Sequence, residues 1–233
     1  MQRFILVRTL HSFIALWIIS VIVFSLIRIS GSPADALLPE EATADQIATL
    51  EEYWGVNDPL HVQYFEYMAN MFTGNFGDSF KWRGHTAREL IVRRIPATLQ
   101  LAGLALLISI VVAVPLGILS AVKKDTVPDF SGKIFALLGQ SLPSFWLGIV
   151  LIWIFAVRLD LLPASGKGGL SNLILPAITL GWFQAAALMR LVRSSMLEVL
   201  DSEYVKLARI KGIPEWKLTW KHCLRNAAIA PLT

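Results

Sequence analysis

The sequence is poor in the residues that build disulfides and metal sites. It contains one cysteine, Cys223, which cannot form a disulfide within the chain. The four histidines are far apart and lack metal-ligand spacing: His11, His61, His85 and His222. We therefore predict neither a metal site nor a cofactor. For Cys223, the apolar neighbour Trp220 predicts burial rather than reactivity.

The sequence also lacks the motifs of common reaction chemistry. No Gly-x-x-x-x-Gly-Lys-Ser/Thr loop is present to cradle phosphates, so we do not expect this chain to hydrolyse ATP itself. The run Gly139-Gln140-Ser141 superficially resembles the serine motif of an intramembrane protease, but no second glycine follows and no later hydrophobic run contains a histidine. The sequence therefore predicts a protein that is not an enzyme.

Charge is missing from four long segments, residues 9–27, 95–122, 134–157 and 168–189, in a chain that is 55% hydrophobic. About 20 helical residues cross the hydrocarbon of a bilayer, so each segment is long enough to span it. The first segment is too long for a cleaved secretory signal, and we interpret it as a retained anchor. The predicted fold class is all-α, a polytopic transmembrane helical bundle with four spans.

The basic residues predict how the spans are oriented. Arg3 and Arg8 precede the first segment, and a further basic cluster follows the last one, whereas residues 29–80 contain nine acidic residues and no Lys or Arg. Because basic residues in short loops stay in the cytoplasm, we predict a cytoplasmic N-terminus. Four arginines between residues 83 and 94 are the exception to this pattern. The net charge of +4 then reflects topology, and nucleic acid is not an expected partner.

The long segment between the first two spans predicts a small helical external lobe. A capping box at residues 43–46 precedes a helical stretch with Ile47, Leu50 and Trp54 on one face, and Gly55 ends it. After Asn57-Asp58-Pro59, a second helical stretch contains apolar side chains at Leu60, Tyr64, Tyr67, Met68 and Met71. One interpretation of this lobe is a solvated lid over the outer mouth.

Within the spans, polar residues near prolines are the candidates for a transport pathway. A proline leaves a helix carbonyl without its hydrogen bond, and lipid cannot satisfy that carbonyl. Gln140 and Ser141 lie beside Pro143, and Gln184 follows Pro176, so we predict that these three polar side chains line a pathway. The alternative is that they form hydrogen bonds between helices.

A basic helix with clear ends follows the fourth span. Asp201 or Ser202 can cap its first turn, Glu203 suits the positive end of its dipole, and Arg209 with Lys211 suits the negative end. Gly212 is expected to end the helix, and Pro214 to begin another.

Both of these helices are amphipathic. On the first, Tyr204, Leu207, Ala208 and Lys211 share a face by their spacing. On the second, the predicted apolar face contains Trp216, Trp220, Cys223, Leu224 and Ala227. One interpretation is a helix pair that rests on anionic lipid headgroups.

The sequence of this region resembles the cytoplasmic coupling motif of ABC importer permeases, and in particular that of the dipeptide and oligopeptide permease family. The matching segments include Glu203-Tyr204-Val205, Ala208-Arg209, Lys211-Gly212 and Leu224-Arg225-Asn226-Ala227. Others lie upstream, at Arg94-Ile95-Pro96-Ala97-Thr98-Leu99, Leu142-Pro143-Ser144-Phe145-Trp146 and Leu175-Pro176-Ala177. Several matching segments in the same order along the chain are more specific for this family than any one segment alone.

This resemblance implies a subunit of an ATP-driven importer in a bacterial inner membrane, with a type I transmembrane domain of which four of six expected spans are present. It implies that residues 1–94 form an anchor and external lobe, and that residues 95–233 form the transmembrane domain, with coupling helices at about 201–226. The residues expected to couple to an ATPase are Glu203, Tyr204, Leu207, Ala208, Arg209, Lys211 and Gly212. Family members continue beyond this point, so we expect a C-terminally truncated chain.

The implied partners are a homologous second permease subunit, two ATP-binding cassette ATPase subunits, an external substrate-binding protein and membrane lipid. The external lobe would then meet the binding protein or the substrate. Dipeptides or oligopeptides are the expected cargo, although related permeases carry glutathione, nickel complexes or sugars. Two other classes stay open at this stage: a secondary transporter driven by an ion gradient, and a membrane scaffold that transports nothing.

Overall fold

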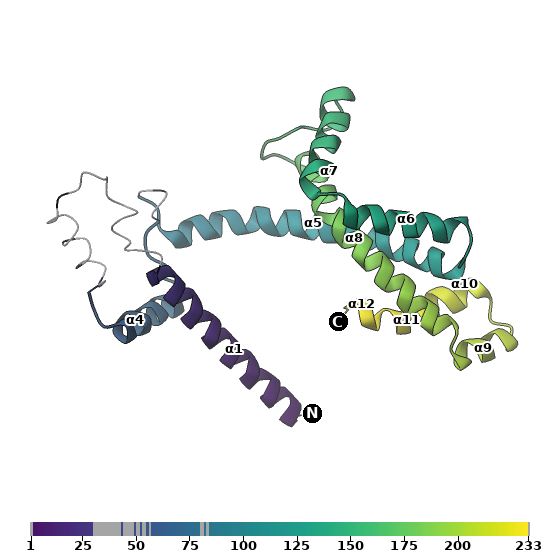
Figure 1. Cartoon of the computed structure of the whole chain (residues 1–233), viewed down its shortest axis with the longest axis horizontal. Helices are drawn as coiled ribbons and strands as arrows, with labels where there is room; N and C mark the ends of the chain where they lie inside the picture. Colours follow the sequence, from purple (N-terminus) through teal and green to yellow (C-terminus); the bar gives the residue numbers. More distant parts are fainter. Residues whose placement is uncertain are drawn as a thin grey trace. The chain divides into compact units, whose positions relative to one another are not determined.

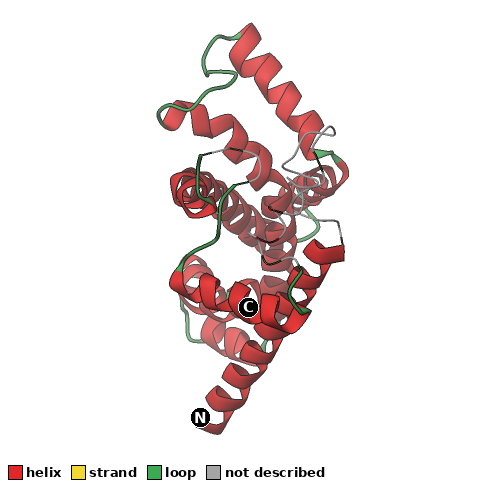
Figure 2. Ribbon diagram, turned by 90° about the vertical axis from the view of Figure 1, so that its left-hand side faces the viewer, coloured by secondary structure: helices red, strands yellow, loops and turns green. Residues whose placement is uncertain are grey.

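The computed structural model describes residues 2–29, 43, 49, 52, 55, 57–79, 82 and 84–232. Within these ranges every regular element is a helix (Figure 2). The chain divides into two compact units, Met1–Arg94 and Ile95–Thr233. The first predicted helix of the external lobe, with Ile47, Leu50 and Trp54, lies outside the described residues.

The first unit contains α1 (Gln2–Ile29) and α4 (Leu60–Thr73), labelled as in Figure 1. α4 confirms the second helix predicted for the lobe, and it ends at Gly74, whose φ of 74° only glycine adopts readily. The two helices meet near the end of α1. There the Ser20 and Tyr64 hydroxyl oxygens lie 2.7 Å apart, and the Phe24 ring packs edge-on against the Tyr64 ring. α4 therefore lies against the last turns of the anchor.

The second unit is built on three long helices. α5 (Ala87–Val122) begins in the first unit and continues into the second, and α6 (Val127–Ser141) and α8 (Leu170–Leu200) follow. Figure 1 shows α6 and α8 side by side, and they make the most extensive helix–helix contact of the described residues. α1, α5 and α8 are each long and apolar enough to cross a membrane, which confirms three of the four predicted spans as single helices.

The remaining predicted span, residues 134–157, is not one straight helix. α6 ends at Ser141, and the chain continues as α7 (Ser144–Leu151) and the π-helical segment η1 (Ile152–Arg158), bent by 105° from α6. The cause is Pro143, which has no amide hydrogen and forces Leu142 before it into an extended conformation, with ψ of 125°. The pair is a fourth span only as a broken one. Pro115 and Pro176, by contrast, lie inside continuous helices.

Small residues let α5, α6 and α8 approach closely. A Cβ atom on Gly117 of α5 would lie 2.9 Å from the Met189 carbonyl oxygen of α8, and one on Gly181 of α8 would lie 2.8 Å from the Ala105 carbonyl oxygen of α5. Between these points the Ser109 hydroxyl donates to the Gly181 carbonyl over 2.9 Å. Because lipid is as apolar as a leucine side chain, such close packing and hydrogen bonding hold the helices together.

Candidate functional site

The residues predicted to couple to an ATPase lie in a bent group of short helices after α8, which we call the elbow. It comprises α9 (Glu203–Ile210), α10 (Glu215–Lys217), the π-helical segment η2 (Leu218–Cys223) and α11 (Leu224–Ala227); α12 (Ile229–Leu232) follows. Figure 1 shows the elbow beside the C-terminal half of α8. α8, α11 and η2 are in direct contact.

The start of α9 differs from the sequence-based prediction. Asp201 ends α8, and Ser202 is the N-cap residue of α9, but neither side chain caps the first turn. The Ser202 hydroxyl donates instead to the Val199 carbonyl at 2.5 Å, and the Ser202 amide donates to the same carbonyl at 3.1 Å, because the last carbonyls of a helix have no partner in the next turn of that helix. The Ser202 carbonyl accepts the Val205 and Lys206 amides. The serine thus secures the end of α8 rather than the start of α9.

Gly212 ends α9, as predicted. Its φ is 75°, its amide donates to the Arg209 carbonyl, and the Ile213 amide donates to the Ala208 carbonyl. These two bonds form a Schellman motif, which satisfies carbonyls that the helix end leaves free. A Cβ atom at Gly212 would meet no atom within 4 Å. Glycine is therefore required here for its backbone conformation and not for close packing inside this chain.

An ion pair braces the two arms of the elbow. The Arg209 guanidinium contacts the Glu215 carboxylate twice, with Nε to Oε1 at 2.8 Å and Nη2 to Oε2 at 3.4 Å. Glu215 begins α10, so this pair joins α9 and α10 across Gly212, and hydrogen bonding to Glu215 raises the pKa of Arg209. Sequence reasoning placed Arg209 at the helix dipole and missed Glu215. The signal was an acidic residue six positions later, directly after the turn.

The inner face of the elbow is fully buried. Val205, Leu218 and Cys223 each have 0% of their surface exposed. They form one apolar cluster with side chains of α5 and α8: Ile118, Ala121, Val192 and Met196. Burial raises the pKa of the Cys223 thiol, in keeping with its predicted inertness. The cluster fixes the elbow to both long helices.

The apolar face predicted for the second helix of the elbow, the one that follows Gly212, is confirmed only in part. Cys223 and Ala227 are buried, but Trp216 and Trp220 are 70% and 51% exposed, and Leu218 takes the inner position. The reason is the π-helical segment η2, whose wider turn places buried residues five positions apart, at Leu218 and Cys223. The two tryptophans instead line a shallow groove of about 230 Å³ beside α5.

The outer face of α9 carries exposed apolar side chains. Tyr204, Leu207 and Ile210 are 42%, 57% and 81% exposed, and Ala208 is half-buried against the cluster. The Tyr204 hydroxyl accepts a hydrogen bond from the Asn226 side-chain amide over 2.8 Å, which ties α9 to α11. Glu203 and Lys211 are exposed as well, and Glu203 pairs with Lys206 at 2.9 Å. Sequence reasoning missed Ile210, although it continues the i, i+3 spacing.

The predicted pathway residues do not share one cavity. Gln140 and Ser141 are exposed at the end of α6, and Gln184 is exposed on α8. Only Gln140 lines the cavity of about 330 Å³ between α6 and α8 in the part of the chain that the structure describes. Their role in a pathway stays a prediction.

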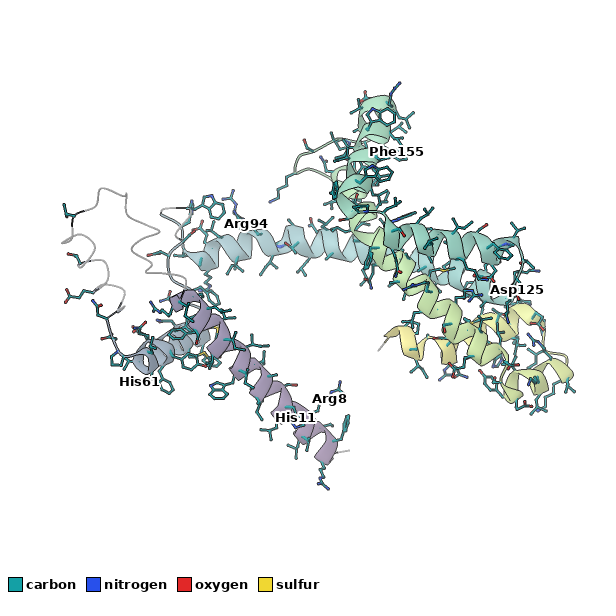
Figure 3. All side chains as sticks on the ribbon, viewed as in Figure 1. Arg8, His11, His61, Arg94, Asp125 and Phe155 are labelled. Atoms are coloured by element: carbon teal, nitrogen blue, oxygen red, sulfur yellow. The ribbon has the colours of Figure 1, made fainter. Side chains whose placement is uncertain are left out.

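The structure contains a buried ionic network that sequence reasoning missed. Asp129, with 0% of its side chain exposed, accepts from Arg193 Nε at 2.7 Å and Arg193 Nη2 at 3.0 Å, and pairs with Lys133 Nζ at 2.8 Å. Ser120 also donates to this carboxylate over 2.5 Å. Asp125, labelled in Figure 3, lies in the turn before α6 and donates its amide to the same carboxylate. The network joins α5, α6 and α8. Its members Ser120 and Arg193 are next in sequence to Ala121 and Val192, which belong to the apolar cluster that holds the elbow.

The comparisons with known proteins cover the whole chain. Residues 113–233 match the family described as binding-protein-dependent transport system inner membrane component. Residues 1–102 match the family described as binding-protein-dependent transport system membrane component, N-terminal. The first match includes α8 and the elbow.

Individual relatives agree with these families. The chain is 34% identical over 238 residues to the oligopeptide transport system permease protein OppB of Salmonella typhimurium, covering 100% of this chain and 76% of OppB. It is 34% identical to the oligopeptide transport system permease protein AppB of Bacillus subtilis, with 100% and 77% covered. It is 36% identical to the dipeptide transport system permease protein DppB of Lactococcus lactis, with 100% and 76% covered.

The chain therefore belongs to the family of binding-protein-dependent transport system inner membrane components. It is a multi-pass inner-membrane protein with a permease role, as the resemblance in its sequence predicted.

Proposed function

We propose that this chain is the permease subunit of an ATP-driven importer of dipeptides or oligopeptides, and that the elbow receives the motion of a separate ATPase. The peptide cargo is supported by the names of its relatives, which are oligopeptide and dipeptide permeases. The proposed assembly contains a second homologous permease, two ATP-binding cassette subunits and an external binding protein. Family membership favours this function over a gradient-driven transporter or a scaffold.

The observation that carries the proposal is the two-faced construction of the elbow. Its inner face, with Val205 and Leu218, is fully buried against α5 and α8, whereas Leu207 and Ile210 project outward from α9. Exposed apolar side chains on a firmly anchored helix mark a surface for a protein partner. A force on α9 would pass through the buried cluster to the membrane helices. The charges of Glu203, Arg209 and Lys211 would set the orientation of docking.

The orientation of the chain is part of the proposal. The elbow follows α8 and must face the cytoplasm to meet an ATPase. With α1, α5, the bent α6–α7 pair and α8 as four crossings, the N-terminus lies on the same side as the elbow. A tag at the N-terminus should then be cut by protease in inside-out vesicles and protected in right-side-out vesicles.

The decisive experiment compares two substitutions in the reconstituted importer. Leu207→Glu places a charge on the outer face of α9, where the side chain is 57% exposed and its loss does not disturb the core. Val127→Glu makes the same kind of change at the first residue of α6, where the side chain is 77% exposed. We expect Leu207→Glu to abolish uptake of a labelled dipeptide and the binding of the ATPase subunits, and Val127→Glu to leave both unchanged.

Two outcomes would contradict the proposal. Normal uptake by Leu207→Glu would show that α9 is not the docking surface. Uptake that proceeds without any ATPase subunit would remove the importer assignment itself.

A further inference from the structure

The cavity of about 330 Å³ between α6 and α8 contains three cationic side chains among its seven lining residues. Lys133 and Gln140 of α6 face Arg190 and Arg193 of α8, with Leu137 and Met189 as apolar walls. Within the part of the chain that the structure describes, Arg190 is exposed and has no acidic partner. The cavity is open on one side. A cavity of this size accommodates a phosphate group with its attached glycerol.

Two of the cations, Lys133 and Arg193, are held in place by acidic side chains, and Arg190 is the cation that these carboxylates do not balance. Asp129 pairs with both Arg193 and Lys133, so one buried carboxylate orients two positive groups. The exposed Asp125 carboxylate lies farther away, at 3.9 Å from Lys133 Nζ. With Arg190 added, the cavity keeps a net positive charge. An anion entering it would find a preorganised site, because the Arg193 side chain is only 20% exposed and already fixed by two hydrogen bonds to Asp129 and one to Ser120.

The position of the cavity along the helices corresponds to the edge of a bilayer. Lys133 immediately precedes the charge-free segment 134–157, and Arg190 immediately follows the charge-free segment 168–189. The apolar walls, Leu137 and Met189, come from inside those segments. The cations therefore lie at the level of lipid headgroups, and the apolar walls at the level of the first acyl carbons.

The surface beside the cavity is also apolar and exposed. On α6, Phe130, Ile134 and Leu137 are 55%, 58% and 66% exposed. An acyl chain could lie along this face while the phosphate occupies the cavity. The positive charge of the cavity, its level at the edge of the bilayer and the apolar face beside it all suit one kind of ligand, an anion with an apolar tail.

We propose that this cavity binds the phosphate headgroup of an anionic phospholipid, with Arg190, Arg193 and Lys133 as its cationic ligands and Gln140 as a hydrogen-bond donor. Basic pockets between membrane helices at this level suit such headgroups. The site would place a lipid against the Asp129 network that joins α5, α6 and α8. The inference does not depend on which cargo the permease carries.

The test measures lipid retention by the full chain. We would purify it in detergent, add phosphatidylglycerol or phosphatidylcholine, and count retained lipids by native mass spectrometry. We expect one phosphatidylglycerol to be retained in preference to phosphatidylcholine. Arg190→Gln should weaken retention about fivefold, the factor expected for one cation lost at a headgroup. Arg190→Lys keeps the charge and should retain the lipid.

The matched control is Lys124→Gln, which removes the same charge from an exposed residue that does not line the cavity. It should leave retention unchanged. Equal retention of both lipids would overturn the proposal, as would an equal loss in Lys124→Gln and Arg190→Gln. Displacement of the lipid by a millimolar dipeptide would assign the cavity to cargo and overturn the proposal. Displacement by inorganic phosphate would assign it to a free anion and overturn the proposal as well. Because Arg190 is exposed, its variants should keep the wild-type melting temperature.

Discussion

The anchoring of the elbow can be tested with the chain's own cysteine. Leu218 and Cys223 are both fully buried in the cluster that holds the elbow to α5 and α8. Leu218→Ala removes buried methyl groups and leaves a cavity. Such changes cost about 2–5 kcal/mol in protein cores. We expect the lower end, about 2 kcal/mol, because the short helices around Leu218 can relax into the space.

The readout is the rate at which a maleimide alkylates Cys223. The thiol has no exposed surface, and burial raises its pKa, so it reacts only when the elbow opens. A loss of about 2 kcal/mol in the free energy of opening raises the open population, and the rate, about 30-fold. In the same way, a buried backbone amide exchanges its hydrogen only when the structure around it opens. Trp216→Ala is the matched control because this larger side chain is 70% exposed and should change the rate by less than about threefold.

The pH dependence gives a second check. The folded elbow holds the thiol protonated, since its pKa is raised there. This contribution to stability is present below the pKa of the free thiol and is lost as the pH rises through the higher, folded pKa. Alkylation of a free thiol levels off above pH about 9. For Cys223 the rate should keep rising beyond that pH.

An unchanged rate in Leu218→Ala, or an equal rise in Trp216→Ala, would refute the buried position of Leu218.

Three further predictions concern other parts of the second unit. Asp129→Asn leaves the partly buried Arg193 without its counter-charge and should lower stability by about 3 kcal/mol, measured as a fall in melting temperature in detergent. Gly117→Val forces methyl groups against α8 and should cost about 1–3 kcal/mol, measured as a loss of monodisperse protein after extraction. A double-mutant cycle with Arg209→Ala and Glu215→Ala should give a coupling of about 0.5 kcal/mol in Cys223 alkylation, because both side chains are about half exposed.

Each of these predictions has its own contrary result. Asp125→Asn, a change at a carboxylate that is 69% exposed, should leave the melting temperature unchanged, and an equal fall in both aspartate variants would argue against a special role for the buried one. Gly103→Val adds the same bulk where no atom lies within 4 Å, so equal losses for both glycine variants would contradict close packing at Gly117. Additive effects in the cycle would show that the ion pair does not brace the elbow.

The sequence predicted those features that depend on local chemistry. Charge-free runs located α5 and α8 because a helix of about 20 apolar residues suits a bilayer whatever its neighbours are. Gly212 was identified as the end of α9 because glycine adopts a positive φ at little cost. Pro143 signalled a break, but the 105° angle depends on packing against α8, which a local pattern does not contain.

The features that were missed depend on distant residues or on an unusual turn. Asp129 and Arg193 are 64 positions apart, so no spacing rule connects them. The inner face of η2 was assigned from the ordinary helical period of 3.6 residues, and the π-helical turn moved Leu218 inward and Trp216 outward. Ser202 was expected to cap α9, but the nearby Val199 carbonyl competes for the same hydroxyl.

Docking of an ATPase subunit on the outer face of α9 can be detected by photocrosslinking. A photoreactive amino acid would replace Ile210, which is 81% exposed, or Val127, which is 77% exposed, in the assembled importer. We expect a covalent adduct to an ATP-binding subunit from position 210 and none from position 127. An assembled, active importer that gives no such adduct from position 210 would contradict this docking.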